Sequence, residues 1–218
     1  MINLLICALF GYLVGTVNPS YLIARRRGFD IRQAGSGNAG GSNAVITMGK
    51  KTGALCCAFD FAKAYLVVKM MTWMFPLVKL SFIVTGASCI LGHIFPFYMK
   101  FKGGKGLACL GGVVLAYNPL VFTVLLFSEI VFVLLVDYIC FVSMTGSAVF
   151  SVVYGFMNHD LIGALLFVGI TLIICWRHKD NIRRIANGTE LRLSFMWKHD
   201  EEKERVEKNL GGEITHLN

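Results

Sequence analysis

The chain has 218 residues, of which 56% are hydrophobic and only 16% charged, with a mean hydropathy of +0.64. A soluble domain carries about 25% charged residues, so the composition excludes an ordinary soluble enzyme and predicts a membrane protein. The net charge of +8 could indicate nucleic-acid binding, but the basic residues gather in short regions beside apolar segments, which argues against a nucleic-acid partner.

Apolar segments run roughly over residues 2–24, 52–76, 80–99, 107–118, 120–136, 141–157 and 161–176. Long apolar runs indicate transmembrane helices. We therefore predict an all-α, polytopic membrane protein with about seven transmembrane helices, the first of them a single retained helix. Turns are expected at Asn118-Pro119 and at residues 158–160.

The segment 107–118 is short for a membrane span. Twelve residues at a rise of about 1.5 Å each reach only about 18 Å, whereas the hydrocarbon core is about 30 Å thick. This helix either extends back into the glycine-rich loop that precedes it or is re-entrant.

Most of the 21 basic residues fall in three regions: residues 25–51, residues 100–105 and the chain after residue 176. The positive-inside rule places all three in the cytoplasm. We therefore expect the N-terminus outside and the C-terminus in the cytoplasm. We assign residues 1–192 to a membrane domain and residues 193–218 to a charged cytoplasmic tail, a short helix followed by disorder.

The first polar cluster is the glycine- and asparagine-rich stretch 35–43, GSGNAGGSN. Its start matches G-x-G-x-x-G, but a dinucleotide site needs a preceding strand, and here an apolar helix and an arginine run precede it. A flexible linker is one interpretation. The other is a polar lining, in which Ser36, Asn38 and Asn43 hydrogen-bond to substrate oxygens.

The second cluster is residues 92–106, GHIFPFYMKFKGGKG, the most informative stretch of the chain. Glycines let backbone N–H groups approach an anion closely, and lysine adds a point charge that suits phosphate. This predicts a phosphate-binding loop at the membrane surface. His93 precedes the loop and is either a structural or a functional residue.

The third cluster, residues 177–184, follows the last apolar segment. It is either a basic anchor to anionic lipid headgroups or a second anion site, in which His178 and Asn181 share one helix face at spacing i, i+3. The second apolar segment also contains Asp60 and Lys63, which can pair at the same spacing. Ionisable residues in membrane helices are costly, so this pair is either structural or lies on a substrate path.

Cysteine spacing gives no sign of a metal site. The seven cysteines lie in apolar segments without C-x-x-C spacing, and are expected to be small buried hydrophobic residues. We predict neither a metal nor another cofactor.

In this order, the three clusters resemble the bacterial acyl-phosphate-dependent glycerol-3-phosphate acyltransferases, the PlsY family. The first motif of that family, G-S-G-N-x-G-x-[TS]-N, is similar to residues 35–43. Its second, G-H-x-F-P-x(4)-F-x-G-G-K-G, is matched at every fixed position by residues 92–106. Its third, R-H-x-x-N-I-x-R continuing to G-x-E, is matched by residues 177–190, and the Asp-x-x-Lys pair is also present. The resemblance covers residues 1 to about 192.

The resemblance implies a seven-helix enzyme of the bacterial plasma membrane with its active site at the cytoplasmic face. Such an enzyme transfers a fatty acyl group from acyl phosphate to the 1-hydroxyl of sn-glycerol-3-phosphate, giving lysophosphatidic acid and phosphate within membrane lipid. The candidate catalytic residues are then Ser36, Asn38, His93 and Lys105. The candidate substrate-binding residues are Asn43, Gly103, Gly104, Gly106, Arg177, His178 and Asn181.

The chemistry suits these residues, because acyl phosphate already carries a good leaving group. The enzyme mainly has to hold two anions together and align the hydroxyl with the carbonyl. We expect the 103–106 backbone and Lys105 to hold one phosphate and stabilise the departing charge. The third cluster would hold the glycerol phosphate. The base is either His93 or a phosphate oxygen of the substrate, and an acyl-enzyme on Ser36 stays open.

Two positions depart from the family pattern. Where the family usually has an arginine, this chain has Ile46, for which Arg32 or an arginine of the tail could substitute. A loop that usually reads [RK]-Y-V-S-L has Asp137 in place of the basic residue and Cys140 in place of the serine. An inactive or substrate-shifted paralogue is therefore one alternative.

A small transporter of organic phosphate is another alternative. The polar clusters gather on one side and not at the membrane midplane, where transporter sites usually lie, and this favours the enzyme. The other glycerol-phosphate acyltransferase superfamily uses H-x(4)-D, and no histidine here has an aspartate five positions on, which favours acyl phosphate over acyl-CoA. The oligomeric state is left open, with a monomer as the simplest case.

Overall fold

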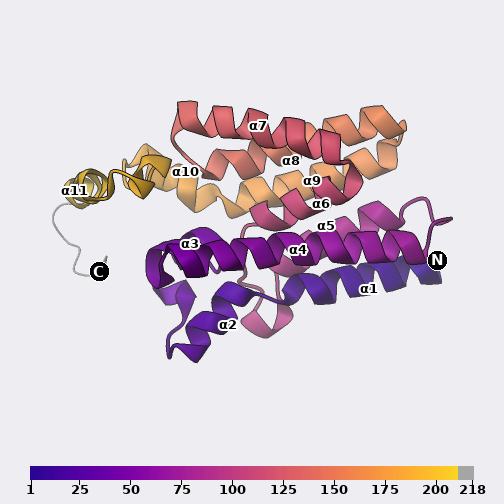
Figure 1. Ribbon diagram of the computed structural model, residues 1–218, viewed down its shortest axis with the longest axis horizontal. Coiled ribbons are helices and arrows are strands. Elements are labelled where there is room, and N and C mark those ends of the chain that lie inside the picture. Colours follow the sequence, from indigo (N-terminus) through magenta and orange to yellow (C-terminus); the bar gives the residue numbers. More distant parts are fainter. Residues whose placement is uncertain (211–218) are drawn as a thin grey trace.

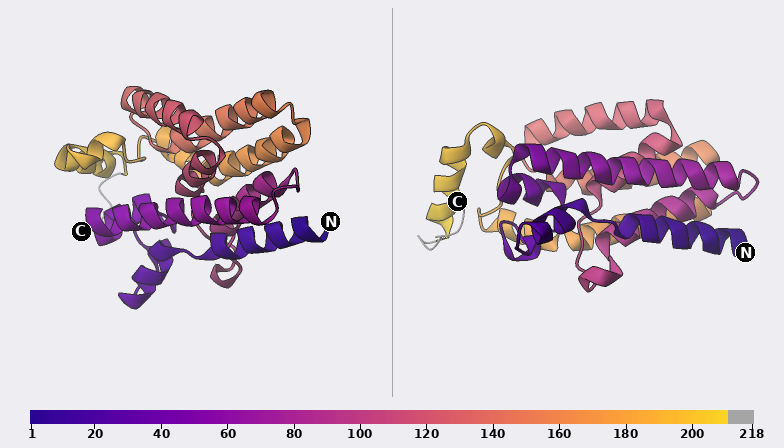
Figure 2. Two further views of the ribbon diagram at one scale, coloured as in Figure 1. Left: turned by 45° about the vertical axis from the view of Figure 1, so that its right-hand side comes forward. Right: turned by 60° about the horizontal axis from the view of Figure 1, so that its bottom comes forward.

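The structure, a computed structural model, describes residues 1–210, and every regular element in that part of the chain is helical. The α-helices are α1 (Ile2–Thr16), α2 (Pro19–Arg26), α3 (Gly41–Met48), α4 (Lys50–Met74), α5 (Ser81–Ile94), α6 (Leu107–Tyr117), α7 (Pro119–Val136), α8 (Cys140–Asn158), α9 (Leu161–Arg177), α10 (Lys179–Ala186) and α11 (His199–Asn209). Short 3₁₀ turns lie at Ile31–Gln33, Phe97–Met99 and Leu193–Met196. The N-terminus lies at one end of the molecule, and α3, α10 and α11 lie at the other (Figure 1, Figure 2).

The first apolar segment is not the single helix that the sequence predicts. The chain breaks between α1 and α2, because Pro19 has no N–H to continue the helical ladder. The Asn18 side chain then caps α2 by accepting the N–H of Tyr21 at 2.8 Å. The Val17 carbonyl, which the break leaves without a helical partner, accepts a hydrogen bond from the Lys63 ammonium of α4. The break therefore joins the α1–α2 junction to α4.

Glycine allows α1 and α5 to pack closely. A Cβ at Gly15 would lie 2.2 Å from the carbonyl oxygen of Cys89, and one at Gly92 would lie 2.2 Å from that of Tyr12. Contacts this close leave no room for a side chain, so only glycine lets the two backbones touch. The packing fixes the end of α5, from which the glycine-rich loop emerges.

The two turns predicted from the sequence are confirmed. Asn118 caps α7 by accepting N–H groups of its first turn, and Pro119 is the first residue of the helix. The helix α8 ends at Asn158, and Asp160 caps α9 by accepting the N–H of Gly163 at 3.2 Å. These turns bring α7, α8 and α9 side by side (Figure 1).

The hydrophobic core lies between α1, α4, α5, α6, α8 and α9. The rings of Phe82, Phe150, Tyr154 and Phe167 contact one another there, the closest pair having centroids 4.9 Å apart. In contrast, α7 buries only Val133 among its own residues and exposes an apolar surface. Such a surface is expected of a helix that faces lipid.

By length and composition, four helical segments of the described chain could span a membrane: Ile2–Arg26, Ser81–Met99, Pro119–Val136 and Cys140–Asn158. The pair α9 and α10, bent by 44°, would be a fifth. The protein is therefore an all-helical integral membrane protein with four or five candidate spans. The 25-residue helix α4 is long enough but carries Asp60, Lys63 and Lys69, and α6 has only 11 residues because it begins after the glycine-rich loop.

The tail contains the short helix that the sequence predicts, α11. The 3₁₀ turn at Leu193–Met196 and the helix α11 pack against each other, and α11 lies beyond α10 at the end of the molecule (Figure 1). The predicted short helix is confirmed. The disorder predicted after it lies outside the described residues, and the domain boundary at residue 192 stays a prediction.

Candidate active site

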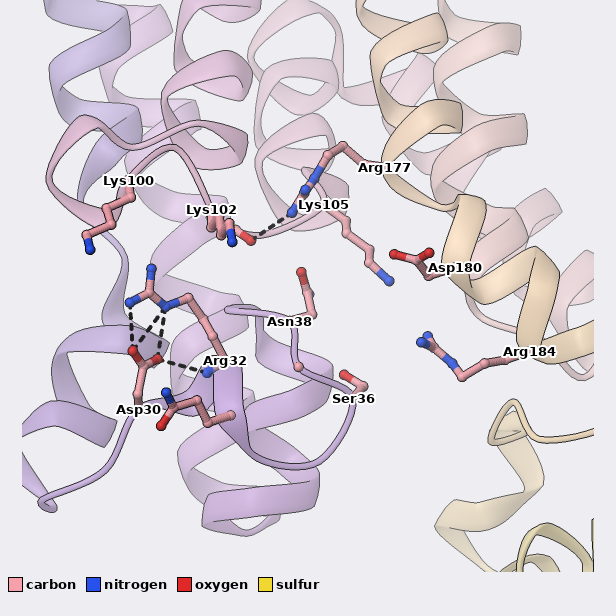
Figure 3. Close-up of a pocket in the computed structure, with 13 residues that line it drawn as sticks. Asp30, Arg32, Ser36, Asn38, Lys100, Lys102, Lys105, Arg177, Asp180 and Arg184 are labelled. Atoms are coloured by element: carbon pink, nitrogen blue, oxygen red, sulfur yellow. Dashed lines mark hydrogen bonds and ion pairs between the residues drawn. The ribbon is translucent and has the colours of Figure 1, made fainter. Parts of the chain in front are cut away.

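Three segments that lie far apart in the sequence enclose a polar pocket of about 460 Å³. They are the loop before α3, the glycine-rich loop before α6 and the α9–α10 region (Figure 3). The lining residues are Asp30, Arg32, Gln33, Ser36, Gly37, Asn38, Lys100, Lys102, Gly103, Lys105, Arg177, Asp180 and Arg184. Six of these side chains are basic and two are acidic, so the pocket favours anions. The predicted convergence of the three polar clusters is confirmed.

The loop before α3 is held by a single side chain, that of Asn43. Its Nδ2 donates to the carbonyl oxygens of Ile31, Ala34 and Asn38, each at 2.9 Å, and its Oδ1 accepts the N–H of Ser36 at 2.8 Å. Asn43 is fully buried and does not line the pocket. Asn43 therefore shapes the loop, whereas we expected it to contact the substrate.

The same loop places two candidate residues at the pocket. Ser36 is exposed, and Asn38 is half-buried beside it. The Oδ1 of Asn38 is buried and has no hydrogen-bond partner among the described residues. A buried polar atom without a partner is costly, so Asn38 is suited to a contact that a bound ligand would complete.

The glycine-rich loop packs directly on the end of α5. The N–H groups of Gly103 and Gly104 donate to the carbonyl oxygens of Ile94 and His93 at 3.0 and 3.1 Å. A Cβ at Gly104 would lie 2.1 Å from Nε2 of His93. These glycines are thus required for close packing, and their amides are engaged inside the protein. This differs from the amide cradle for phosphate that the sequence suggested.

Gly106 starts α6 with a φ of 94°, a left-handed conformation that glycine adopts without strain. It is buried and does not line the pocket, so its role is also conformational. The residue of this loop whose side chain has a defined set of polar contacts is Lys105.

Lys105 belongs to a network of side chains on the α10 side of the pocket. Its Nζ donates to Oδ1 of Asn181, and Nδ2 of Asn181 donates to Oε1 of Glu190. The other carboxylate oxygen of Glu190 accepts the Nε–H of Arg184 at 2.6 Å. Burial, together with the positive charges of Arg184 and Arg177, lowers the pKa of Lys105 to about 8. Lys105 is therefore mostly protonated at neutral pH but close to titration.

The two remaining candidate residues of the third cluster, Arg177 and His178, lie apart from each other. Arg177 lines the pocket, donates to the Gly103 carbonyl at 3.3 Å and has a buried Nε without a partner in the described chain. His178 is buried away from the pocket. Its Nδ1 contacts the Ile174 carbonyl at 2.8 Å and must donate to it, and its Nε2 lies 3.2 Å from the Ser143 hydroxyl. His178 thus fixes the α9–α10 bend against α8.

Comparison with known proteins agrees with this geometry. A model of a family described as glycerol-3-phosphate acyltransferase matches residues 5–188. The glycerol-3-phosphate acyltransferase of Bacillus subtilis (strain 168) is 36% identical over 190 residues, which are 86% of this chain and 96% of that protein. That of Listeria monocytogenes is 37% identical over 199 residues, or 89% of this chain and 99% of that protein.

This chain belongs to the glycerol-3-phosphate acyltransferase family.

A solved structure of a family member agrees as well. The crystal structure of PlsY (YgiH), an integral membrane glycerol 3-phosphate acyltransferase, in its glycerol 3-phosphate form, is similar with a TM-score of 0.80 and 30% identity. The similarity covers 88% of this chain and 96% of that one. The lysophosphatidic acid form of the same protein gives a TM-score of 0.75 at 30% identity, over 87% of this chain and 94% of that one.

Behind the pocket of this acyltransferase lies a buried polar cluster. Asp60 and Lys63 form the predicted ion pair, at 2.6 Å, and Nδ1 of His93 lies 3.4 Å from both Asp60 and Lys63. His93 packs against Gly104 and does not line the pocket. Asp60, His93 and Cys109 offer atoms close enough together for a metal site, but the Lys63 ammonium already provides a cation at the carboxylate.

Several pocket residues were missed in the sequence. Asp180 and Arg184 face the pocket from α10 at spacing i, i+4, a periodicity that could have revealed them. Arg32, which the sequence offered as a substitute for the arginine absent at Ile46, also lines the pocket and is held by Asp30 at 2.6 Å and by the Met99 carbonyl at 2.7 Å. The hydrogen bond from Arg32 lowers the pKa of the Asp30 carboxyl.

The structure also places the two departures from the family pattern. Ile46 lies on α3 and does not line the pocket, where Arg32 and Arg184 supply guanidinium groups. Asp137 ends α7 and its carboxylate accepts the N–H and hydroxyl of Ser194 at 2.8 and 2.7 Å. The acidic residue therefore anchors the tail of this acyltransferase.

Proposed function

We propose that this glycerol-3-phosphate acyltransferase takes its acyl group from an acyl phosphate. It would transfer that group to the 1-hydroxyl of sn-glycerol 3-phosphate and release lysophosphatidic acid and inorganic phosphate. Both substrates are phosphate anions, and the solved relative is described in forms with glycerol 3-phosphate and with lysophosphatidic acid. The pocket therefore has to hold two phosphates close together.

The observation that carries this proposal is the distribution of charge around the pocket. Arg32 and Lys100 lie on one side, and Lys105 and Arg184 lie on the other, with Asn38 between them (Figure 3). Lys102 and Arg177 also line the pocket, between these two pairs. Cations on every side of the pocket suit two anions, whose mutual repulsion the enzyme has to offset. Holding both reactants in register can contribute about 7–11 kcal/mol of the barrier.

In the proposed reaction the 1-hydroxyl oxygen attacks the carbonyl carbon of the acyl phosphate. A carbon–oxygen ester bond forms, the bond from that carbon to the bridging phosphate oxygen breaks, and phosphate leaves with the bonding electrons. Lys105 and Arg177 stabilise the charge that develops on the leaving phosphate. The hydroxyl proton passes to a phosphate oxygen, which balances the reaction without an external base.

This assignment chooses between the two bases that the sequence left open. His93 does not line the pocket and is engaged with Asp60 and Lys63, so a phosphate oxygen of the substrate is the better candidate. Ser36 and Asn38 would orient the reacting groups from the facing loop. The structure offers Ser36 no histidine partner among the residues that line the pocket, which favours direct transfer over an acyl-enzyme.

The other predicted residues receive supporting roles in this proposal. Asn181 holds Lys105, His178 fixes the α9–α10 bend, and Asn43 shapes the loop that carries Ser36 and Asn38. Gly103 brings the loop close to α5 and presents its carbonyl to Arg177, while Gly104 and Gly106 set the backbone path.

For the topology we propose seven crossings, with the N-terminus outside and the pocket on the cytoplasmic face of a bacterial plasma membrane. The basic pocket lies away from the N-terminus, as the positive-inside rule requires. In this arrangement α4 crosses with Asp60 paired to Lys63, and α6 is a short crossing. Reporter domains fused to either end would test this topology. Activity of a reporter that works only when exported, fused at the C-terminus, would contradict the topology.

The donor is tested with purified protein, sn-glycerol 3-phosphate and either palmitoyl phosphate or palmitoyl-CoA, following phosphate and lysophosphatidic acid together. We expect equal amounts of both products from palmitoyl phosphate and no lysophosphatidic acid from palmitoyl-CoA. Turnover of palmitoyl-CoA alone would overturn the proposed donor. Phosphate without lysophosphatidic acid would indicate a different acceptor.

A matched pair of variants links this activity to the pocket. Lys105→Ala removes a pocket cation, whereas Lys79→Ala removes the same charge from an exposed position between α4 and α5. We expect Lys105→Ala to lower kcat about 100-fold or more, as the loss of a group that stabilises developing charge does, and Lys79→Ala to leave it unchanged. Equal activity of the two variants would contradict the role of Lys105.

A further inference from the structure

The helix α11 lies outside the residues that the family model matches, which end at residue 188, yet it contacts the loop that follows α10. Arg205 of α11 donates from Nη1 to the carbonyl oxygen of Gly188 and from Nη2 to that of Glu190, the latter at 2.7 Å. Asn209 also donates to the Gly188 carbonyl, at 2.8 Å. One face of α11 therefore holds the backbone on both sides of Thr189.

Arg205 is itself fixed by a buried carboxylate. Its Nε and Nη2 donate to Glu202 at 3.1 and 2.8 Å, and Glu202 is 5% exposed. Glu202 also accepts the Arg192 N–H at 3.4 Å and pairs with the Arg192 guanidinium at 3.6 Å. A buried carboxylate that two arginines share holds a defined geometry because its lone pairs are satisfied by directed donors.

A second anchor joins the same segment to the membrane helices. The Asp137 carboxylate at the end of α7 accepts both the N–H and the hydroxyl of Ser194, and its backbone carbonyl accepts the N–H of Leu193 at 2.8 Å. Asp137 is one of the two departures from the family pattern. The departure thus anchors the 3₁₀ turn Leu193–Met196, against which α11 packs.

The loop held by α11 carries the residue that supports Lys105. The Glu190 carboxylate accepts from Asn181 through one oxygen and from Arg184 through the other, and Asn181 accepts from Lys105. A continuous series of hydrogen bonds therefore runs from Arg205, through the Glu190 backbone and side chain, to the pocket.

We propose that α11 is a chain-specific clamp on the phosphate-binding wall, with Arg205 as a positioning residue that sets Glu190 and, through it, Asn181 and Lys105. The inference rests on the proposed function in taking Lys105 to bind substrate phosphate. The tail of this enzyme then supports the geometry of the pocket and is not a solvated extension.

The charges around Lys105 make its titration a test of the clamp. A tail with a purely structural role would leave that titration unchanged. Arg177, Arg184 and the Glu190 carboxylate face Lys105 from α9, α10 and the loop after it, and the Cys140 thiol faces it from α8. The two arginines lower the pKa of Lys105, whereas the Glu190 carboxylate raises it. If Arg205 is lost and Glu190 moves away, Lys105 loses its proton at a lower pH.

The test compares full-length Arg205→Ala with Lys208→Ala, which removes the same charge from an exposed position of the same helix. Two measurements are made on detergent-purified protein. Hydrogen exchange reports the opening of residues 188–193, and calorimetry reports the affinity for sn-glycerol 3-phosphate from neutral to alkaline pH. Arg205→Lys, which keeps the charge but not the two-pronged donor geometry, is the conservative variant.

For Arg205→Ala we expect faster exchange at residues 188–193 and an affinity about tenfold weaker, the size that a displaced binding group produces. We also expect the alkaline loss of binding to shift to lower pH. Lys208→Ala should match the unsubstituted protein in exchange, in affinity and in the pH dependence of binding, and Arg205→Lys should lie between the two alanine variants.

Equal behaviour of Arg205→Ala and Lys208→Ala would overturn the clamp, as would faster exchange without a change in affinity or in its pH dependence. These outcomes differ from a failure of the proposed function. Such a failure appears in the unsubstituted protein, as no binding of glycerol 3-phosphate or no turnover of palmitoyl phosphate, before any variant is compared.

Discussion

The two walls of the pocket are supported in different ways. The wall before α3 depends on Asn43, whose side chain makes four hydrogen bonds to backbone groups at most 12 residues away. The wall beside α10 depends on contacts between distant side chains, such as that of Lys105 with Asn181, which are 76 residues apart. One wall is built from residues that lie close together in the sequence, and the other is assembled from residues that lie far apart in it.

This difference decides how each wall can vary. A loop held by one buried amide keeps its shape whatever happens elsewhere, but it fails if that amide is lost. The geometry of an assembled wall can be changed by residues outside it. Each added contact, such as that of Arg205 with the Glu190 backbone, shifts the geometry of the next contact in the series.

The largest effect is expected at the local wall. Asn43→Ala leaves the Asn38 carbonyl and the Ser36 N–H without a partner, and the carbonyls of Ile31 and Ala34 each lose one of two partners. Each buried polar group left unpaired costs about 1–3 kcal/mol. We expect kcat/KM to fall about 100- to 1000-fold, because the loop can no longer present Ser36 and Asn38. Steady-state kinetics with palmitoyl phosphate would measure this.

Thr47→Ala is the control for that change, since its hydroxyl only donates to the carbonyl of Asn43 within α3, at 2.8 Å. It should retain nearly full activity. If Asn43→Ala were as active as Thr47→Ala, the account of a wall held by one residue would be wrong.

The next effect concerns the charge on Lys105 in the assembled wall. Its pKa is lowered to about 8, so kcat/KM should fall about tenfold per pH unit above that value, as the free enzyme loses the protonated amine. Glycerol phosphate is already a dianion there, because its second pKa is about 6. A pH profile of kcat/KM would show the alkaline limb.

Lys105→Arg distinguishes the titration of Lys105 from the titration of other groups. Arginine stays protonated throughout, so the variant should be less active at neutral pH but should lack the alkaline limb. An unchanged limb in Lys105→Arg would assign the titration to another group.

A smaller effect is expected at the second anchor of the tail. Asp137→Lys removes the acceptor for Ser194 and introduces the charge usual in the family, while leaving the pocket lining intact. We expect KM for glycerol 3-phosphate to rise about three- to tenfold with little change in kcat, as loss of uniform binding does. Glu204→Lys, the same charge change at an exposed site of α11, should leave KM as it is.

The smallest effect is expected at Ile46. It lies on α3 outside the pocket lining, where Arg32 and Arg184 already supply guanidinium groups. Ile46→Arg should therefore change kcat/KM by no more than about twofold, which is about 0.4 kcal/mol. A gain well above that would mean that this chain lacks a phosphate contact that the substitution restores.

The sequence predicted the parts of this site that depend on local chemistry. The three clusters, the Asp60–Lys63 pair and the turns at Asn118 and Asn158 all follow from short spacings, and the structure has them. It did not predict the break at Pro19, because the apolar run masks a single proline with a capping asparagine before it. Nor did it predict that the amides of Gly103 and Gly104 face α5, since glycine serves close packing and anion binding equally well.

The docking of the tail could not have been predicted from the sequence. Asp137 and Ser194 are 57 residues apart, and nothing in the charged sequence around Arg205 distinguishes a buried pair from a solvated one. Only the fold brings the end of α7 beside residues 193–196. For the same reason Asn43 was taken for a ligand contact, although the same amide chemistry serves its neighbouring backbone.

The central claim is that the pocket joins a hydroxyl of glycerol phosphate to the carbonyl carbon of an acyl phosphate. The most direct test is to supply sn-glycerol 3-phosphate carrying ¹⁸O at its 1-hydroxyl, together with unlabelled palmitoyl phosphate, and to analyse both products by mass spectrometry. The account predicts that all the label is in the ester oxygen of lysophosphatidic acid and none is in the released phosphate. Label in a phosphate product would place the attack at phosphorus and contradict the account.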